Sequence, residues 1–209
     1  HTAKTHGLAD ILLYKKRLEK TRLTWPQQIL DLVEPYNIKK VNDLGCNYFQ
    51  LYKEMKIRKL RYDYFGYDLE PQFVDIGLKT FVNLKKKHKI CNIETFKVRK
   101  CDFSLISATL EHVEHPMKVL KNLVRSTGKI IIIRGYFGEK EHRTIEKTQN
   151  NALCNHNQFS FKKTESFFKK NKFKVNFILD KATNYSNNFK LIKASKKKIY
   201  ICFALKDED

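Results

Sequence analysis

The sequence predicts an α/β fold with a mostly parallel sheet and helices on both of its faces. From Val41 onward, stretches with strand character alternate with stretches of helical periodicity. The most apolar stretch, 128–135 (GKIIIIRG), has the composition of a strand buried on both faces. A chain of 209 residues suits one domain with one core, which we expect to span 1–209.

The elements are expected in this order. Apolar residues recur at helical spacing before and after Trp25-Pro26, which predicts two helices within 1–36. The remaining 37–209 should form a Rossmann-like core, with strands at 41–45, 62–70, 89–93, 102–108, 128–135, 173–179 and 197–206. Helices are expected at 48–60, 71–87, 116–126 and 164–170. The last two of these seven strands follow five strand–helix units closely, which favours an antiparallel last strand.

Composition limits the cellular locations and the binding partners that we expect for this protein. The longest aliphatic run is four residues, far short of the ~20 that a membrane span needs. Five cysteines without a C-x-x-C pair indicate neither a disulfide framework nor a zinc knuckle, so we assign no metal ligands and expect a cytoplasmic protein. The net charge of +20 comes from 34 Lys and only 8 Arg, which favours a solvated surface over base recognition. Nucleic acid stays the alternative partner to a small molecule.

The first chemical signal is the loop DLGCNYFQ at 43–50, where a strand ends and a helix begins. Gly45 allows the backbone to approach a ligand, and a helix N-terminus offers free N–H groups. Asp68 ends the second strand 25 positions after Asp43, where a carboxylate can bind two ribose hydroxyls. The pair predicts an adenosine-containing cofactor.

These segments resemble the motifs of class I S-adenosylmethionine-dependent methyltransferases. The resemblance runs from about 41 to 206 and rests on VNDLGCNYFQ, YFGYDLEP, DFSLISATLEHVEHP and GKIIIIRG. The segment HNQFSFKKTESFFKKNKFKV is further similar to small-molecule members. The family's fold has a seven-stranded sheet, and its cofactor is S-adenosyl-L-methionine, which leaves as S-adenosyl-L-homocysteine.

The resemblance also implies which residues contact the cofactor. Asp43 would orient the methionine end, Gly45 would leave room for the cofactor, and Asp68 would hold the ribose. The stretch after the third strand would flank adenine, and the end of the fourth strand would line the methionine and sulfonium end. The full implied set is Asp43, Gly45, Cys46, Asn47, Asp68, Leu69, Asn92, Ile93, Ser107, Ala108 and Thr109.

One departure from the family concerns its loop pattern D-x-G-x-G-x-G. This chain has Asn47 and Phe49 at the later two glycine positions. Asn tolerates a left-handed backbone, but the bulkier Phe49 would narrow the site or cover the cofactor. A methyltransferase-like binding subunit without activity is the hypothesis that this residue raises.

Methyl transfer to a hydroxyl is helped by a general base, and His is the side chain poised near neutral pH. The candidates are His112 and His115, after the fourth strand, and His156, in the polar insertion 135–160 that we expect to be irregular and to shape the acceptor pocket. The alternative role for His112 and its neighbour Glu111 is to brace their loop by hydrogen bonds.

The resemblance favours O-methylation of a sugar, a nucleotide-sugar or a surface-polysaccharide precursor, with N-methylation of an amino sugar as an alternative. A second alternative is RNA 2′-O-methylation. Glu111-His112 and His156 are similar to the Glu-x-x-Glu-His and distal His that hold a metal in enzymes acting on RNA 3′ ends, but Ala108 stands at the first Glu position. The oligomeric state and contact with a membrane surface stay open.

Overall fold

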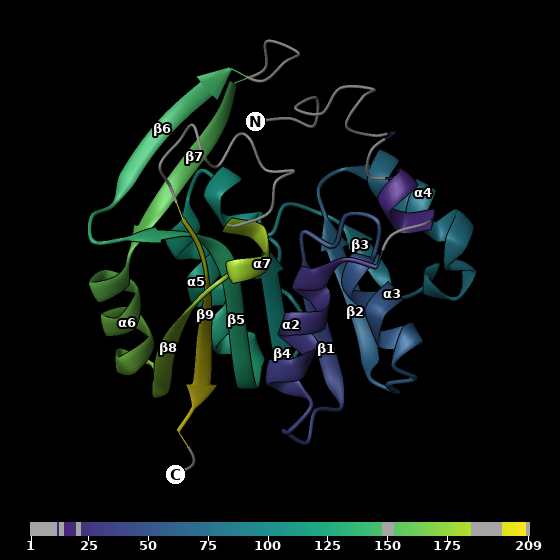
Figure 1. The fold of residues 1–209 in the computed structure, drawn as a ribbon, viewed down its shortest axis with the longest axis horizontal. Coiled ribbons are helices and arrows are strands. Elements are labelled where there is room, and N and C mark those ends of the chain that lie inside the picture. Colours follow the sequence, from purple (N-terminus) through teal and green to yellow (C-terminus); the bar gives the residue numbers. More distant parts are fainter. Residues whose placement is uncertain (1–11, 13–14, 20–21, 148–152, 185–197, 208–209) are drawn as a thin grey trace.

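The computed structural model describes residues 12, 15–19, 22–147, 153–184 and 198–207. Within this part of the chain, seven strands form a sheet in the order β3-β2-β1-β4-β5-β9-β8 (Figure 1). Strand β9 lies antiparallel between β5 and β8, which confirms the expected antiparallel last strand. The bounds are β1 Lys40–Leu44, β2 Asp63–Asp68, β3 His88–Ile90, β4 Cys101–Ser107, β5 Thr127–Gly138, β8 Phe173–Leu179 and β9 Ile199–Lys206.

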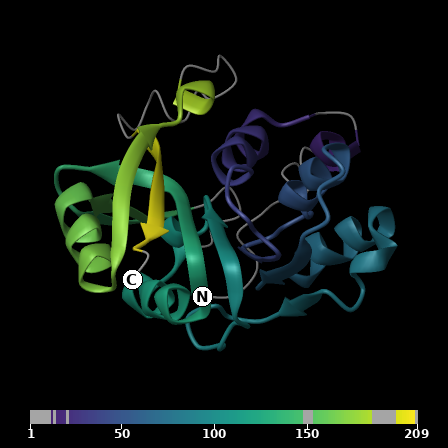
Figure 2. The same ribbon diagram turned by 90° about the horizontal axis from the view of Figure 1, so that it is seen from below.

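Helices cover both faces of this sheet (Figure 2). Alternate isoleucines of β5 face opposite ways: Ile130 and Ile132 pack with helices α2 and α3, and Ile131 and Ile133 pack with α5 and α6. The strand is therefore buried on both faces, as its apolar run predicts. The helical elements are α2 Thr24–Val33, α3 Gln50–Ile57, α4 Pro71–Thr80, η1 Val82–Leu84, η2 Leu110–His112, α5 Pro116–Ser126, α6 Phe161–Lys170 and α7 Lys181–Asn184.

Several predicted boundaries were wrong, among them those of the helix expected at 48–60, which is α3 at Gln50–Ile57. The helix expected at 71–87 ends at Thr80 and is followed by the short turn η1, and strand β3 ends at Ile90 rather than at residue 93. Helix α6 begins at Phe161, three residues early, because the Ser160 hydroxyl accepts a hydrogen bond from the Lys163 N–H and caps the helix. Of the first leading helix, the structure describes only part, at residue 12 and 15–19.

The insertion 135–160 is not irregular, as the sequence led us to expect. Strand β5 continues to Gly138, and the insertion then forms a hairpin of β6 (His142–Lys147) and β7 (Leu153–Ser160). The base of the hairpin is fixed to the sheet because Phe159 and Ser160, the last two residues of β7, pair with the last two residues of β5. The described chain thus has nine strands instead of seven, and the hairpin extends beyond the carboxyl edge of the sheet, at the top of Figure 1.

Phe49 does not cover the cofactor, which corrects the expectation from its position in the loop. Its backbone has φ 61°, the left-handed conformation that the family's glycines adopt freely. Its ring is fully buried and packs edge-on against Tyr64 and His88. Glycines make the space for it: a Cβ on Gly77 of α4 would lie 2.7 Å from the ring, and one on Gly66 of β2 would lie 3.0 Å away.

We therefore predict that Phe49 and Gly77 are energetically coupled. Gly77→Ala places a methyl group against the ring and should lower the free energy of unfolding by about 1–3 kcal/mol, although Ala is ordinarily the better helix former. In a Phe49→Ala background the methyl group has room, so the same change should cost less. Urea unfolding of the double-mutant cycle measures the difference.

The matched control is Gly128→Ala, because a Cβ there would meet only a backbone oxygen at 3.5 Å. Gly128→Ala should leave the free energy of unfolding unchanged or raise it slightly. Additive costs for Gly77→Ala and Phe49→Ala would contradict the packing described here.

Candidate active site

The predicted cofactor residues gather at the carboxyl edge of the sheet. Strand β1 lies between β2 and β4, so the strand order reverses beside it, and ligands bind at such a point in parallel α/β sheets. The loops after β1, β2 and β4 carry Gly45, Asp68 and Ser107–Thr109 to this edge. The loop after β1 is held in place by N–H donation from Gly45 and Cys46 to the carbonyl oxygen of Tyr67.

Asp68 joins two of these loops through its carboxylate. Its Oδ2 accepts the backbone N–H of Asn47 at 2.7 Å, and its Oδ1 accepts that of Glu70 at 2.9 Å. Asn47 has φ 49°, so the hydrogen bond stabilises a backbone that a non-glycine residue adopts at a cost. These two bonds fix the Asp68 carboxylate at the edge where a ribose would bind.

Asp43 lies deeper, and one of its oxygens faces the core. The Tyr64 hydroxyl donates to its Oδ2 at 2.7 Å, and the residue is only 3% exposed. Burial raises the pKa of Asp43 to about 7, opposed by the Tyr64 hydrogen bond and assisted by the nearby charge of Asp68. A carboxyl group in this state carries a proton for part of the time at neutral pH.

The other residues implied as cofactor contacts differ in how far their side chains are exposed. Cys46 and Ile93 are buried in the two cores, so their side chains contribute packing and not a ligand surface. Asn92 accepts the Glu94 N–H at 2.9 Å and so closes its own loop. Leu69 is exposed, as is Ala108, which has φ 51°.

The side chain of Thr109 leaves room for no residue larger than glycine at position 45. A Cβ on Gly45 would overlap the side chain of Thr109, whose hydroxyl donates to the Ser107 carbonyl oxygen at 3.1 Å. The loop after β1 and the loop after β4 are therefore packed together directly. Any larger residue at Gly45 would push them apart.

Two of the three candidate histidines meet at the same edge. The His112 and His156 rings lie 5.0 Å apart between centroids, nearly perpendicular. The His112 Nδ1–H donates to the Asn155 carbonyl oxygen at 2.9 Å, and the Cys154 Sγ lies 3.2 Å from the same nitrogen. His115 is placed differently: it precedes α5, and its backbone N–H donates to Glu94 at 3.0 Å.

The hairpin is held against η2 by amide side chains, which explains why residues 44 positions apart in sequence meet. Asn157 donates to the Val113 carbonyl oxygen at 2.9 Å and Asn155 to that of His112 at 3.5 Å. His112 is exposed as a residue, but the protein around its ring removes part of its hydration and disfavours its charge; the hydrogen bond with Cys154 and the charge of Glu111 outweigh this loss and raise the pKa of His112 to about 9.

Cys154 belongs to this site but was not predicted for it, and Glu111 was predicted only to brace its loop or to bind a metal in the RNA alternative. Glu111 is 3% exposed, and within the described chain its Oε2 has no hydrogen-bond partner. Burial raises the pKa of Glu111, with His112 and Arg134 opposing. Glu111 was visible in the Leu-Glu-His motif, whereas no spacing in the sequence could have pointed to Cys154.

The metal set implied by the RNA alternative is not assembled as expected. The group of side chains that could share an ion consists of His112, Cys154 and His156. Among the described residues, the third member of this group is therefore Cys154 and not Glu111, the ligand that the resemblance implies.

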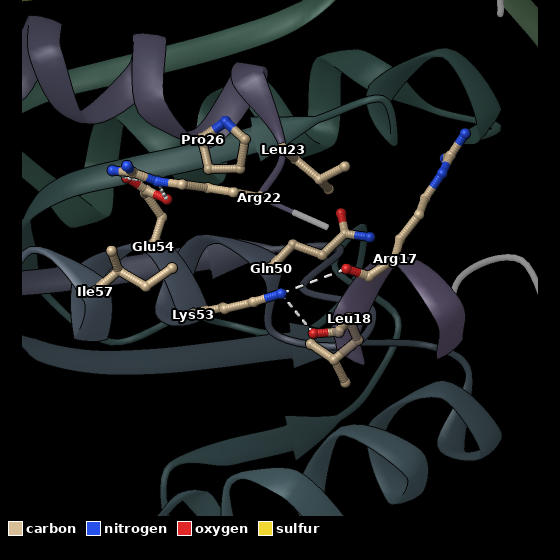
Figure 3. Close-up of a pocket in the computed structure, with 9 residues that line it drawn as sticks. All are labelled: Arg17, Leu18, Arg22, Leu23, Pro26, Gln50, Lys53, Glu54 and Ile57. Atoms are coloured by element: carbon tan, nitrogen blue, oxygen red, sulfur yellow. Dashed lines mark hydrogen bonds and ion pairs between the residues drawn. The ribbon is translucent and has the colours of Figure 1, made fainter. Parts of the chain in front are cut away.

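The leading segment reaches the same loop from the other side. Leu18 packs on Tyr48 and Phe73, and the Lys53 ammonium donates to the Leu18 carbonyl oxygen (Figure 3). Arg22 forms an ion pair with Glu54 of α3. The pocket that these residues line encloses about 10 Å³, the size of one water molecule, so it is too small for a cofactor.

The raised pKa of Asp43 predicts how stability depends on pH. A carboxyl group whose pKa rises on folding from 3.8 to about 7 is most favourable to the folded state below pH 4, and this contribution is lost as the pH rises toward 7. Relative to Asp43→Asn, the wild type should therefore lose about 2 kcal/mol between pH 5 and pH 7. Urea unfolding of both proteins across this range is the measurement, and a constant difference would contradict the assignment.

The described chain contains no helix long and apolar enough to span a membrane. No functionally curated protein matches its sequence. The family model described as methionine biosynthesis protein MetW matches residues 26–163.

Solved structures show the same fold at low sequence identity. An O-methyltransferase from a trans-AT PKS multienzyme of Brevibacillus brevis, in complex with S-adenosyl-L-homocysteine, is 11% identical over 99% of this chain and 81% of its own, with a TM-score of 0.67. An S-adenosylmethionine-dependent methyltransferase from Clostridium acetobutylicum is 11% identical over 96% and 99% of the two chains, with a TM-score of 0.65.

A third structure, 1,6-didemethyltoxoflavin-N1-methyltransferase from Burkholderia thailandensis with bound 1,6-didemethyltoxoflavin and S-adenosylhomocysteine, is 10% identical over 100% of this chain and 92% of its own, with a TM-score of 0.60. The sheet order, the loops at its carboxyl edge and the family match all indicate the same fold. The chain has the fold of the class I S-adenosylmethionine-dependent methyltransferases, and it belongs to the MetW family.

Proposed function

We propose that the protein transfers the methyl group of S-adenosylmethionine to a hydroxyl group of a small, sugar-like acceptor. The observation that carries this proposal is the arrangement of one sheet edge. Asp68 joins the loop after β1 to the loop after β2. The imidazole pair of His112 and His156 lies beyond the end of β4, and β4 is the neighbour of β1 in the sheet. A cofactor bound across β1 would thus direct its sulfonium end toward the imidazoles.

The cofactor end needs few charged groups. Asp68 would accept hydrogen bonds from the ribose hydroxyls, while the exposed Leu69 and Asn92 would border the adenine. At the other end, Ser107, Ala108 and Thr109 would line the methionine portion. Asp43 supports the loop after β1 from the core, where its carboxylate accepts the Tyr64 hydrogen bond. The bound cofactor supplies an activated methyl group on a good leaving group.

The chain then has to position the acceptor and receive a proton. The acceptor oxygen forms a bond to the methyl carbon as the carbon–sulfur bond breaks, and the hydroxyl proton passes to the imidazole of His156, because the raised pKa of His112 keeps that neighbouring ring charged. An amine that arrives unprotonated would need less help from a base. O-methylation is therefore the form of the reaction that makes use of this base.

The polar surroundings favour a hydroxyl-rich acceptor. The buried Glu111, whose Oε2 has no hydrogen-bond partner among the described residues, interacts with the charge of His112, and the half-buried Tyr136 ring lies 6.3 Å from that of His156. Groups of this kind bind several hydroxyls and discriminate against acceptors that lack them. The five cysteines are free thiols, which supports our proposal of a reducing, cytoplasmic location.

The first test is cofactor binding. Asp68→Asn replaces a charged acceptor, so the affinity for S-adenosylmethionine should fall by about 10- to 100-fold in titration calorimetry. Asp75→Asn, an exposed position on α4, is the matched control and should bind like the wild type. Equal affinities of Asp68→Asn and the wild type, with both proteins folded, would overturn the assigned cofactor site.

The second test concerns the acceptor. Release of S-adenosylhomocysteine is measured with panels of nucleotide-sugars, amino sugars and short RNAs. Turnover with nucleotide-sugars is the expected result. Turnover confined to RNA would overturn the sugar assignment, as would turnover confined to the amines.

With the acceptor identified, His156→Gln and His112→Gln should each lower kcat by about 100-fold or more while the affinity for the cofactor stays unchanged. His115→Gln is the control and should retain kcat, because His115 contacts Glu94 through its backbone and lies outside the imidazole pair. A loss of kcat in His115→Gln alone would show that the wrong histidines were chosen.

A further inference from the structure

We infer that His112, Cys154 and His156 form a binding site for a Zn²⁺ ion, and that the ion regulates the proposed methyl transfer by capturing both imidazoles. Each of the three side chains offers one donor atom, and these atoms lie within 4.8 Å of one another. Two imidazoles and one thiolate are a donor set that Zn²⁺ accepts in proteins. The inference rests on the proposed function only for its effect on turnover, since the binding site is defined by the three side chains alone.

The distances are close to those of a zinc site. Bond lengths of about 2.0 Å to nitrogen and 2.3 Å to sulfur place the donors of a tetrahedral site about 3.5 Å apart. The Cys154 Sγ lies 3.2 Å from the His112 Nδ1, the nitrogen that donates to Asn155, so a turn of the ring brings Nε2 to the ion. The remaining closure is about 1 Å, and rotation of the side chains can supply it because His112 is exposed and the other two are partly exposed.

The surroundings orient the rings as ligands. The Nδ1–H of His112 donates to the Asn155 carbonyl oxygen, so the ring presents Nε2, which binds the ion once it has lost its proton. For His156, the carboxylate of Glu146 lies 4.0 Å from Nε2, which favours a lone pair at Nδ1. Backbone carbonyls and carboxylates behind the ligating histidines are the usual support of protein zinc sites.

The backbone that carries the donors is held firmly. Cys154 and His156 are two residues apart on β7, so their side chains leave the same face of the strand. The amide side chains of Asn155 and Asn157, both at least 95% buried, bind the opposite side of β7 to η2 and its following residue. The hairpin thus presents its two donors to His112 as a preformed set.

The consequence for methyl transfer follows from the lone pairs. A ring nitrogen that binds the ion has no lone pair left to accept the acceptor's proton. Cys154 loses its own proton when it binds as a thiolate, so the ion holds all three groups in a form that cannot serve as a base. Three protein donors leave a fourth position for water, which closes the acceptor end further.

The test of the site uses the metal alone. One Zn²⁺ per chain should bind in calorimetry, and Co²⁺ in its place should give a sulfur-to-metal charge-transfer absorption. Cys154→Ser should remove that absorption and weaken Zn²⁺ binding by at least about 10-fold. Cys91→Ser is the matched control, because Cys91 is also a partly buried free thiol but lies outside the cluster. Absorption or affinity unchanged in Cys154→Ser would overturn the site.

The regulatory part is tested on turnover relative to each protein's own metal-free rate. Zn²⁺ should inhibit the wild type and Cys91→Ser at concentrations that leave Cys154→Ser much less inhibited. Activation of the wild type by Zn²⁺ would overturn the inhibitory role. Cofactor titrations separate this from the proposed function: Zn²⁺ binding without any binding of S-adenosylmethionine would refute the methyltransferase proposal and leave the metal site standing.

Discussion

The carboxylate of Asp68 is the contact on which the site at the carboxyl edge depends. It accepts backbone N–H groups from the loop after β1 and from the start of the loop after β2, and so fixes Asn47 in a left-handed conformation. Without this acceptor, two N–H groups at the edge would lose a charged partner, at a cost of about 1–3 kcal/mol each. One side chain thus shapes the loop and remains directed to the place where a ribose would bind.

The buried ring of Phe49 supports the same loop from below. In the family pattern this position is a glycine, whose freedom at positive φ costs nothing. Here the backbone strain of about 1–2 kcal/mol is offset by burial of a whole aromatic ring in the space left by Gly66 and Gly77. The loop therefore keeps the conformation of a glycine-rich loop by packing, and the departure from the family pattern does not reach the cofactor side.

Sequence patterns were sufficient for the sheet and for the cofactor loops, because both depend on local signals. The isoleucine run of β5, the acid that ends β2 and the glycine after β1 are each visible within a few residues. The acceptor end was harder, because β6 is exposed throughout and the alternating buried positions of β7 begin with two asparagines, so no apolar–polar alternation marks the hairpin in the sequence. The meeting of Cys154 with His112 and His156 depends on how Asn155 and Asn157 bind η2, which is tertiary information.

The central claim is that one sheet edge holds the cofactor between Asp68 and the imidazole pair. A crystal structure of the complex with S-adenosylhomocysteine tests it most directly. The account predicts that the ribose hydroxyls lie within hydrogen-bond distance of the Asp68 carboxylate and that the sulfur lies at the end of β4, facing His112 and His156. A ribose bound away from Asp68, or a sulfur directed away from the hairpin, would contradict it.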